Sequence, residues 1–312
     1  MSFTTEVKSE IGQNELKDCC TRAQLAALIQ LCSTVVFNSR GMSLTVRIEN
    51  ATTAKRIWKL IKDTYNAEME LSVLKKMNLK KNNIYLIKVI TRADEILHDM
   101  DLMVDGKIKN HPGYQVVRKD CCARAYLAGA FMASGSVNSP TKSNYHLEIA
   151  TLDQDHAFFI QKLMLRFDLP AKHIIRRNQH VVYLKASERI SDFLRCVGAY
   201  DSVMNFEDLR IQRDFRNSLT RLDNCEVANE MKTMKAGRKQ SEDIEILEKY
   251  GKMQYLDKRL QEVAELRKAY PEASLNDLCE TYEQNTGLSI SKSGMKHRLA
   301  KLSELAQKLI EK

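Results

Sequence analysis

The chain lacks the features by which membrane-spanning and secreted proteins are recognised. It holds no run of about 18 apolar residues, so no segment is predicted to span a bilayer. Residues 1–6 do not begin a basic stretch followed by an apolar one, so we expect no secretion signal. With 44% apolar residues over 312 positions, the composition is typical of a globular protein with room for two or three domains.

The chain also lacks the C-x-x-C spacing typical of zinc sites, although it has eight cysteines. Four of them form adjacent pairs, Cys19-Cys20 and Cys121-Cys122, and adjacent cysteines do not bridge easily. The others stand in amphipathic helical contexts, where a reduced thiol behaves as a small apolar side chain: Cys32, Cys196, Cys225 and Cys279. The pattern favours structural cysteines over metal or redox chemistry, so we predict no metal, no cofactor and a reducing cytoplasmic location.

A repeated segment is the most informative feature that is present. Lys17–Ala27 and Lys119–Gly129 agree at eight of eleven positions. A repeat of about 100 residues is too long for a solenoid unit and suits a duplicated half-domain. Each half shows helical and strand-like periodicity in the order helix, two short strands, helix, two strands, helix. We therefore predict one α+β domain made of two halves, residues 1–110 and 111–216.

The expected elements of the two halves correspond in order. The strand-like runs with alternating apolar residues are 44–49 and 83–89 in the first half, and 147–151 and 180–185 in the second. The expected helices after the repeated segments are 54–62 and 93–103, then 157–164 and 186–196. In the repeated helices, Ala27 and Gly129 are small enough to let two axes approach closely. A glycine inside a helix costs about 1 kcal/mol relative to alanine, which indicates a packing reason for Gly129.

Leu25–Ser33 and Leu127–Gly135 resemble the LAGLIDADG motif of homing endonucleases. The resemblance implies two motif helices packed at a pseudo-twofold axis and a saddle of strands over DNA. It also implies an acid at the eighth motif position to bind the catalytic metal. Cys32 and Ser134 stand there, and the sixth positions, Gln30 and Met132, do not restore the acid. Because Mg²⁺ requires hard oxygen ligands, we predict no metal site and no nuclease activity.

Two further acids, Asp18 and Asp120, also repeat, but they stand at the opposite, N-terminal ends of these helices. There we expect each to cap its helix or to interact with the helix dipole. The net charge is +9, and residues 40–90 are rich in Lys and Arg. The candidate DNA contacts of this region are Lys55, Lys59, Lys75, Lys76, Lys80 and Lys81. A solvated charged face explains the same composition about equally well.

The amino-acid composition changes after about residue 216. Residues 217–250 are polar and without proline, which predicts a helical linker. Residues 251–312 then read as an all-α domain: an amphipathic helix ended by Pro271, a short helix opened by a capping box at Ser274, a turn with Gly287, and a third helix. This order is typical of a helix-turn-helix, with the motif at about 274–308.

The third helix has four cations and no acid from Ser291 to Ser303. A helix that reads DNA needs polar groups for base edges and cations for phosphates. The candidate DNA-binding residues are Ser274, Ser291, Lys292, Ser293, Lys296, His297, Arg298 and Lys301. The alternative is an ordinary three-helix bundle with a basic outer face, and we favour double-stranded DNA as the partner.

The chain resembles the WhiA family of bacterial regulators over essentially its full length. The resemblance is carried by the two LAGLIDADG-like motifs together with residues 216–229 and residues 289–299. The resemblance implies a DNA-binding regulator without catalysis, connected with sporulation-type transcription or with cell division and chromosome segregation. Abundant Lys and Ile favour the second setting and a nucleoid-associated protein. It also implies a first domain that contacts DNA or a protein such as an RNA polymerase sigma factor.

Two alternatives stay open at this point. One is an active LAGLIDADG endonuclease. The other is a scaffold or small-ligand module in which only residues 235–312 bind DNA. The duplication supplies the twofold arrangement within one chain, so a monomer is permitted.

Overall fold

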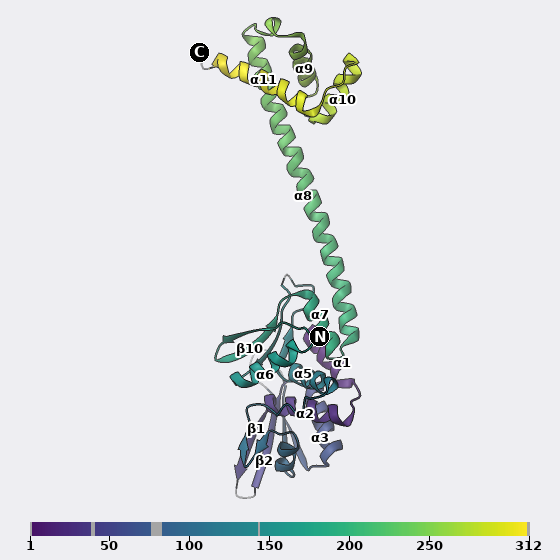
Figure 1. The fold of residues 1–312 in the computed structure, drawn as a ribbon, viewed down its shortest axis with the longest axis vertical. Helices are drawn as coiled ribbons and strands as arrows, with labels where there is room; N and C mark the ends of the chain where they lie inside the picture. Colours follow the sequence, from purple (N-terminus) through teal and green to yellow (C-terminus); the bar gives the residue numbers. More distant parts are fainter. Residues whose placement is uncertain (1, 39–40, 76–82, 143, 311–312) are drawn as a thin grey trace. The chain divides into compact units, whose positions relative to one another are not determined.

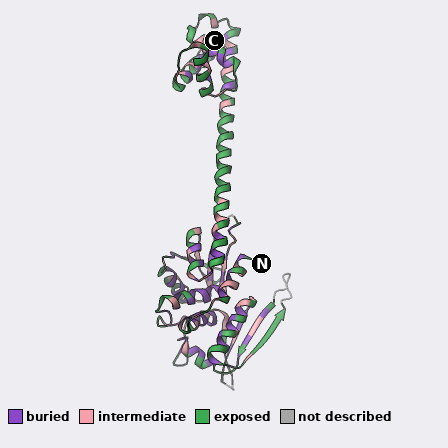
Figure 2. Cartoon of the chain, turned by 90° about the vertical axis from the view of Figure 1, so that its right-hand side faces the viewer, coloured by how far each residue is buried: buried purple, intermediate pink, exposed green. Residues whose placement is uncertain are grey.

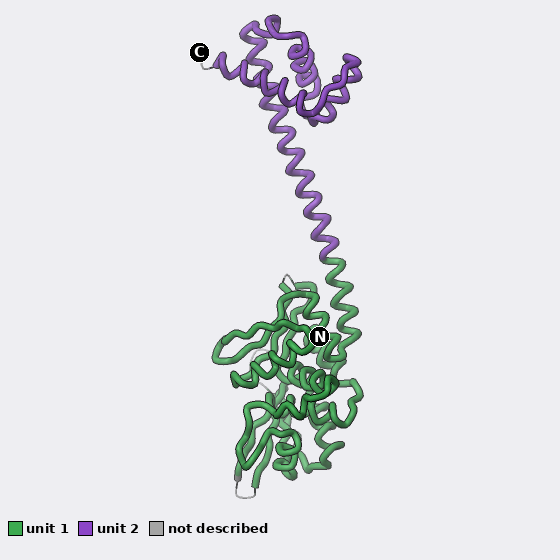
Figure 3. Tube along the Cα trace, in the orientation of Figure 1, with its two compact units in different colours: residues 1–213 green, residues 214–312 purple. Residues whose placement is uncertain are grey.

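The computed structural model describes residues 2–38, 41–75, 83–142 and 144–310. The chain divides into two compact units, residues 1–213 and 214–312, which we call the N-terminal and the C-terminal unit (Figure 3). The first combines helices with sheets and the second is all helical, which confirms the predicted fold class. Among the described residues, no helix has both the length and the apolar character that crossing a membrane requires.

From α2 in the first half and α5 in the second, the two halves of the N-terminal unit repeat one order of elements, and α1 precedes the first repeat (Figure 1). The first half contains α1 Phe3–Gln13, α2 Asp18–Cys32, β1 Ser33–Asn38, β2 Gly41–Ile48, α3 Ala51–Tyr65, β3 Met69–Lys75, β4 Asn83–Val89 and α4 Ala93–Asp99. The second contains α5 Asp120–Ser134, β7 Gly135–Val137, β8 Leu147–Thr151, α6 Gln154–Leu165, β9 Lys172–Arg176, β10 Gln179–Leu184 and α7 Ser187–Cys196. The short hairpin of β5 Met103–Val104 and β6 Lys107–Ile108 lies between them.

Both four-stranded sheets have the same strand order, β1-β2-β4-β3 and β7-β8-β10-β9, with antiparallel neighbours. Alternation puts Leu44, Val46 and Ile87 into the core, while Arg47 and Lys88 face the other way and are exposed. The expected helix 93–103 is shorter than predicted. It ends at Asp99, because Met103 pairs with Ile108 in the small hairpin.

One helix, α8 Tyr200–Lys249, belongs to both cores. Val203 and Phe206 near its start are buried in the N-terminal unit, and Ile244 and Leu247 near its end are buried in the C-terminal unit. Residues between these ends are mostly exposed (Figure 2). The helix therefore runs without a break across the predicted boundary at 216/217 and through the predicted linker 217–250.

The C-terminal unit adds three helices to the end of α8. They are α9 Lys258–Ala269, α10 Leu275–Thr286 and α11 Lys292–Ile310, and a short 3₁₀ turn, η1 Met253–Tyr255, precedes them. Its core takes Val263 from α9, Leu278 from α10 and Met295, Leu299 and Leu302 from α11. The apolar spacing of α11 thus forms the buried side of the helix, and the opposite side faces solvent.

Candidate nucleic-acid interface and the degenerate metal positions

Local hydrogen bonds define the turn between α10 and α11. Ser274 and Asp277 form the capping box: the amide of Asp277 donates to the Ser274 hydroxyl at 3.3 Å, and the amide of Ser274 donates to the Asp277 carboxylate at 2.9 Å. Gly287 ends α10 in the left-handed conformation, with φ of 68°. The Ser291 hydroxyl then accepts from the amide of Gly294 at 3.1 Å, which caps the start of α11.

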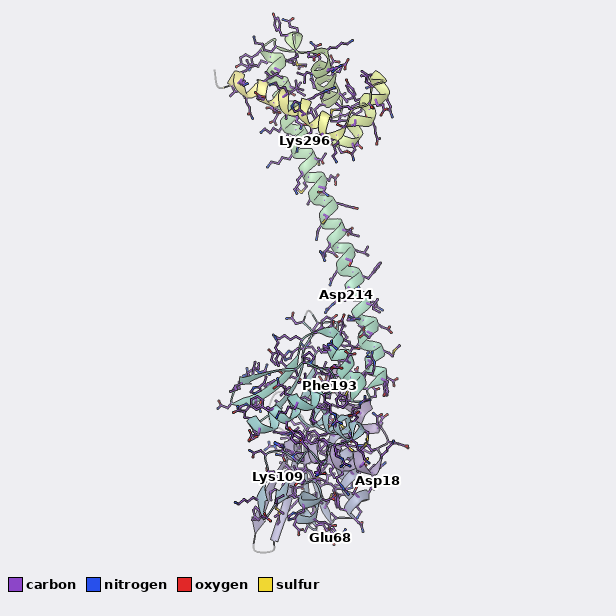
Figure 4. All side chains as sticks on the ribbon, viewed as in Figure 1. Asp18, Glu68, Lys109, Phe193, Asp214 and Lys296 are labelled. Carbon is purple, nitrogen blue, oxygen red and sulfur yellow. The ribbon has the colours of Figure 1, made fainter. Side chains whose placement is uncertain are left out.

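The first turns of α11 present the predicted polar residues to solvent. Lys292, Ser293, Lys296 and His297 are all exposed, and the helical spacing puts Ser293 and His297 on the side opposite the buried Met295, with the two lysines flanking them. Figure 4 labels Lys296 on α11. Neither Lys292 nor Lys296 has an ion pair with any described side chain. Both ammonium groups are therefore available to a phosphate.

Arg298 lies differently from the other cations of the helix. Its guanidinium donates to the Tyr282 hydroxyl at 3.1 Å and lies over that ring, 5.4 Å from the centroid. The Tyr282 hydroxyl in turn donates to the Glu262 carboxylate at 2.8 Å. This chain of contacts joins α11, α10 and α9, so Arg298 helps to hold α11 against the other two helices.

Lys301 is exposed but paired. Its ammonium lies 3.1 Å from the carboxylate of Glu304, which also pairs with Lys308 at 2.6 Å. These hydrogen bonds, Lys308 first, hold the pKa of the Glu304 carboxyl below its usual value. An exposed pair of this kind is weak, so Lys301 can exchange Glu304 for a phosphate at small cost.

The candidate contacts of the N-terminal unit are separated in the fold. Lys55 and Lys59 are exposed on α3, which packs against α1 and α2, whereas Lys75 is exposed at the end of the edge strand β3. Lys76, Lys80 and Lys81 lie outside the described residues. The described lysines therefore form no single basic patch.

The solvent faces of the two sheets carry mixed charge. On the first sheet, Lys88 on β4 pairs in register with Glu70 on β3. On the second, Glu148 on β8 accepts from the Arg176 guanidinium at 3.0 Å and lies 2.9 Å from the His146 imidazole. Despite its partial burial, these hydrogen bonds hold the pKa of the Glu148 carboxyl below its usual value. Such a surface neutralises part of its own positive charge.

The positions that bear acids in the nucleases lie at the ends of α2 and α5. Burial raises the pKa of the Cys32 thiol to about 12, and a cation, the Lys8 ammonium, acts on it electrostatically. Lys8 on α1 is buried, its nitrogen lies 5.9 Å from the Phe131 ring centroid, and burial lowers its pKa to about 8. The Ser134 hydroxyl is buried without a hydrogen-bond partner in the described parts of the chain. Neutral ligands beside a buried ammonium do not suit a hard divalent cation.

The opposite ends of α2 and α5 correct one expectation. Asp18 and Asp120 are the first helical residues, the N-cap positions are Lys17 and Lys119, and neither helix has a side-chain cap among the described residues. The expected capping by aspartate is therefore wrong, because each carboxylate lies one residue too far along its helix. Each remains in the first turn, where it interacts favourably with the helix dipole, and Asp120 also pairs with Arg166.

The motif helices α2 and α5 pack closely at the small residues. A Cβ built on Gly129 would lie 2.4 Å from the carbonyl oxygen of Gln24 and 3.0 Å from the Cβ of Ala27. Real Cβ atoms do not come so near to a backbone oxygen, so the approach of the helices requires glycine there.

A duplicated LAGLIDADG-like domain followed by a helix-turn-helix domain is the class that this fold defines. The family models that match are the WhiA N-terminal LAGLIDADG-like domain over residues 18–103, the WhiA LAGLIDADG-like domain over 123–216 and the WhiA C-terminal HTH domain over 219–306. The chain belongs to the WhiA family.

Relatives of known name support this assignment along the whole chain. The chain is 43% identical to the probable cell division protein WhiA of Bacillus cereus (strain B4264), covering 99% of this chain and 97% of that protein. It is 44% identical to the protein of the same name from Brevibacillus brevis, covering 100% and 98%. The crystal structure of full-length DUF199/WhiA from Thermatoga maritima has the same fold, with a TM-score of 0.58, 20% identity and 99% of each chain covered.

Proposed function

We propose that this protein is a non-catalytic, DNA-binding regulator that acts in cell division and chromosome segregation, through transcription or through chromosome binding itself. The observation that carries the proposal is that Lys292 and Lys296, at the start of α11, are exposed and have no ion pair among the described side chains. The helix that precedes them, α10, is capped at its start. The names of the relatives from Bacillus cereus and Brevibacillus brevis, both probable cell division proteins, support the cellular setting. Binding to chromosomal DNA would place the protein at the nucleoid.

The interface works by dividing two tasks along α11. Ser293 and His297 offer hydrogen-bonding groups to base edges in the major groove, and Lys292 and Lys296 neutralise flanking phosphates. Each neutralised phosphate releases counterions, which makes affinity fall with salt. Lys301 contributes less than the other two lysines, because it must first leave Glu304.

The test compares two triple variants of the full chain on one double-stranded operator or chromosomal fragment. Lys292→Ala, Lys296→Ala and Lys301→Ala together should weaken binding and reduce the slope of log K against log salt by about 1 per phosphate contact. The matched control removes the same charge from the N-terminal unit: Lys55→Ala, Lys59→Ala and Lys75→Ala. An unchanged slope in the first variant would contradict binding by α11, and an equal reduction in the second would show that the N-terminal unit contacts phosphate as well.

The absence of catalysis is tested separately. Cys32, Ser134 and the Lys8 ammonium replace the hard ligand set of a nuclease, so supercoiled plasmid incubated with the protein and Mg²⁺ or Mn²⁺ should stay intact. Protein-dependent nicking that EDTA abolishes would support the endonuclease alternative. A mock purification from cells that do not express the protein serves as the control for contaminating nucleases.

The N-terminal unit better suits a protein partner than a phosphate backbone. Its sheets combine compensated charges with exposed apolar side chains, Val36 on β1, Leu74 on β3 and Ile174 on β9. Such surfaces are typical of protein interfaces. A sigma factor of RNA polymerase is the partner class that we propose, and pull-down with purified polymerase holoenzyme, with and without sigma, tests it.

A further inference from the structure

The two adjacent cysteine pairs meet in space. Cys19 and Cys20 are the second and third residues of α2, and Cys121 and Cys122 occupy the same positions in α5. The four sulfur atoms all lie within 4.8 Å of one another. Asp18, labelled in Figure 4, marks the end of α2 at which this cysteine cluster lies. Spacing along the chain predicts no metal site here, and it is the packing of the two halves that brings the thiols together.

The cluster is half inside the protein and half accessible. Cys20 and Cys122 are buried, while Cys19 and Cys121 are partly exposed. The Cys121 and Cys122 sulfurs are 3.9 Å apart, and the Cys122 thiol donates to the backbone carbonyl of Cys19 at 3.5 Å. The second contact crosses from one half of the duplicated domain to the other. The buried pair, Cys20 and Cys122, is thus positioned by core packing. The partly exposed pair, Cys19 and Cys121, is accessible to an ion from solvent.

The separations suit one metal ion. A zinc ion with four thiolates at about 2.3 Å in tetrahedral geometry has sulfur atoms about 3.8 Å apart. The observed separations need to shrink by at most about 1 Å to reach that geometry, which side-chain rotation can supply. An iron–sulfur cluster needs more widely spaced thiolates, because several metal and sulfide atoms must fit between them. The arrangement therefore favours a single thiophilic ion.

Burial raises the pKa of the inner thiols, Cys20 and Cys122, whereas the starts of two helices bring positive potential to the cluster. α2 and α5 are each 15 residues long, and both direct the positive end of the dipole at the cluster. Neither start has a side-chain cap in the described part of the chain, although the amides of Cys20 and Cys122 already donate to the carbonyls of Lys17 and Lys119. Two N-cap lysines, Lys17 and Lys119, add positive charge beside the four sulfurs. Asp18 and Asp120 in the same first turns balance these two lysines, so the two helix dipoles supply the remaining positive potential beside the sulfurs.

We propose that Cys19, Cys20, Cys121 and Cys122 bind a single structural Zn²⁺ ion that joins the two halves of the duplicated domain. The four protein ligands fill the tetrahedral coordination shell, so the site holds no water for catalysis. On binding, the protons of the thiols leave to solvent and four Zn–S bonds form, without any change in oxidation state. The site is independent of α11 and of DNA binding.

The first experiment measures metal in the full-length, untagged protein purified under reducing conditions. Elemental analysis and native mass spectrometry should give one zinc per chain, and replacement by Co²⁺ should give the visible absorption of tetrahedral tetrathiolate cobalt. A reduced wild-type protein that binds no zinc when zinc is supplied would overturn the proposal. A metal-free mass lowered by the hydrogens lost in disulfide bonds would also overturn it, in favour of a redox pair.

The second experiment assigns the ligands through the partly exposed pair, whose replacement disturbs the core least. Cys19→Ser with Cys121→Ser should reduce zinc from one per chain to none, while far-UV and near-UV circular dichroism show that the fold persists. Cys196→Ser with Cys225→Ser removes two thiols elsewhere and should keep one zinc. Zinc retained by the first variant, or lost equally from the second, would contradict the assignment.

Discussion

The carbonyl oxygen of Gln24 occupies the space that a side chain at position 129 would need, 2.4 Å from the place of a Cβ on Gly129. Gln24 cannot easily move, because it is buried and its side-chain oxygen accepts from the Arg56 guanidinium at 2.9 Å. Arg56 is itself held by the carbonyls of Gly12 and Asn14. The close packing of the motif helices therefore rests on one missing methyl group.

Gly129→Ala should destabilise the N-terminal unit by about 2 to 3 kcal/mol, despite the better helix propensity of alanine, because a backbone oxygen must be displaced. Urea unfolding followed by circular dichroism measures the loss. Adding Ala27→Gly relieves only the contact at 3.0 Å and should restore little stability. Full recovery in that double variant would show that the Ala27 contact, and not the Gln24 carbonyl, is limiting.

Lys8→Met should stabilise the protein at neutral pH, by about 2 to 3 kcal/mol, since burial lowers the pKa of Lys8 from 10.5 to about 8. The unfolded chain then holds this proton more tightly than the folded chain. Wild-type stability consequently rises relative to the variant between about pH 8 and 10.5, and the advantage of the variant should shrink there. Unfolding at pH 7 and pH 10 tests this, with exposed Lys55→Met as the control. A gain independent of pH would contradict the assigned cause.

Ser274→Ala separates capping from DNA contact. The hydroxyl is engaged with the amide of Asp277, so its loss should cost about 1 kcal/mol of stability in the C-terminal unit. The salt dependence of DNA binding should not change, because no cation is removed. Since hydrogen bonds from Ser274 hold the pKa of Asp277 below its usual value, the box should also weaken as pH falls through that pKa. Thermal unfolding between pH 3 and 7 follows it, and weaker DNA binding by the folded variant at fixed salt would show that Ser274 also contacts DNA.

Arg267→Ala should destabilise the C-terminal unit more than any exposed substitution on α9. The buried guanidinium donates to the carbonyls of Tyr270, Pro271 and Ala273, and its removal leaves these oxygens without that donor. A loss of about 3 kcal/mol is expected. Glu265→Ala on the exposed side of α9 is the matched control. Equal effects of the two substitutions on the free energy of unfolding would show that the three hydrogen bonds of Arg267 do not stabilise the unit.

The fold was predictable because a segment of the sequence occurs twice and because apolar and polar residues alternate clearly in the strands. The run 83–89 became β4, and Met295, Leu299 and Leu302 became the buried side of α11 as their spacing indicates. Less predictable were contacts that depend on packing between elements. The charge of Arg298 does not reveal that Tyr282 holds it, and a polar composition cannot distinguish a linker from the middle of α8. The meeting of the cysteine pairs depends on the register of α2 against α5, which neither segment specifies alone.

The shared helix α8 also determines where the C-terminal unit can be separated from the rest of the chain. Ile244 and Leu247 complete the core around Val263, Leu278 and Met295. They belong to α8, whose residues Val203 and Phe206 are buried in the other core. A fragment that contains only α9 to α11 would lack the core residues that α8 contributes. Transfer of the C-terminal unit to another protein, in evolution or in the laboratory, must therefore include the last turns of α8.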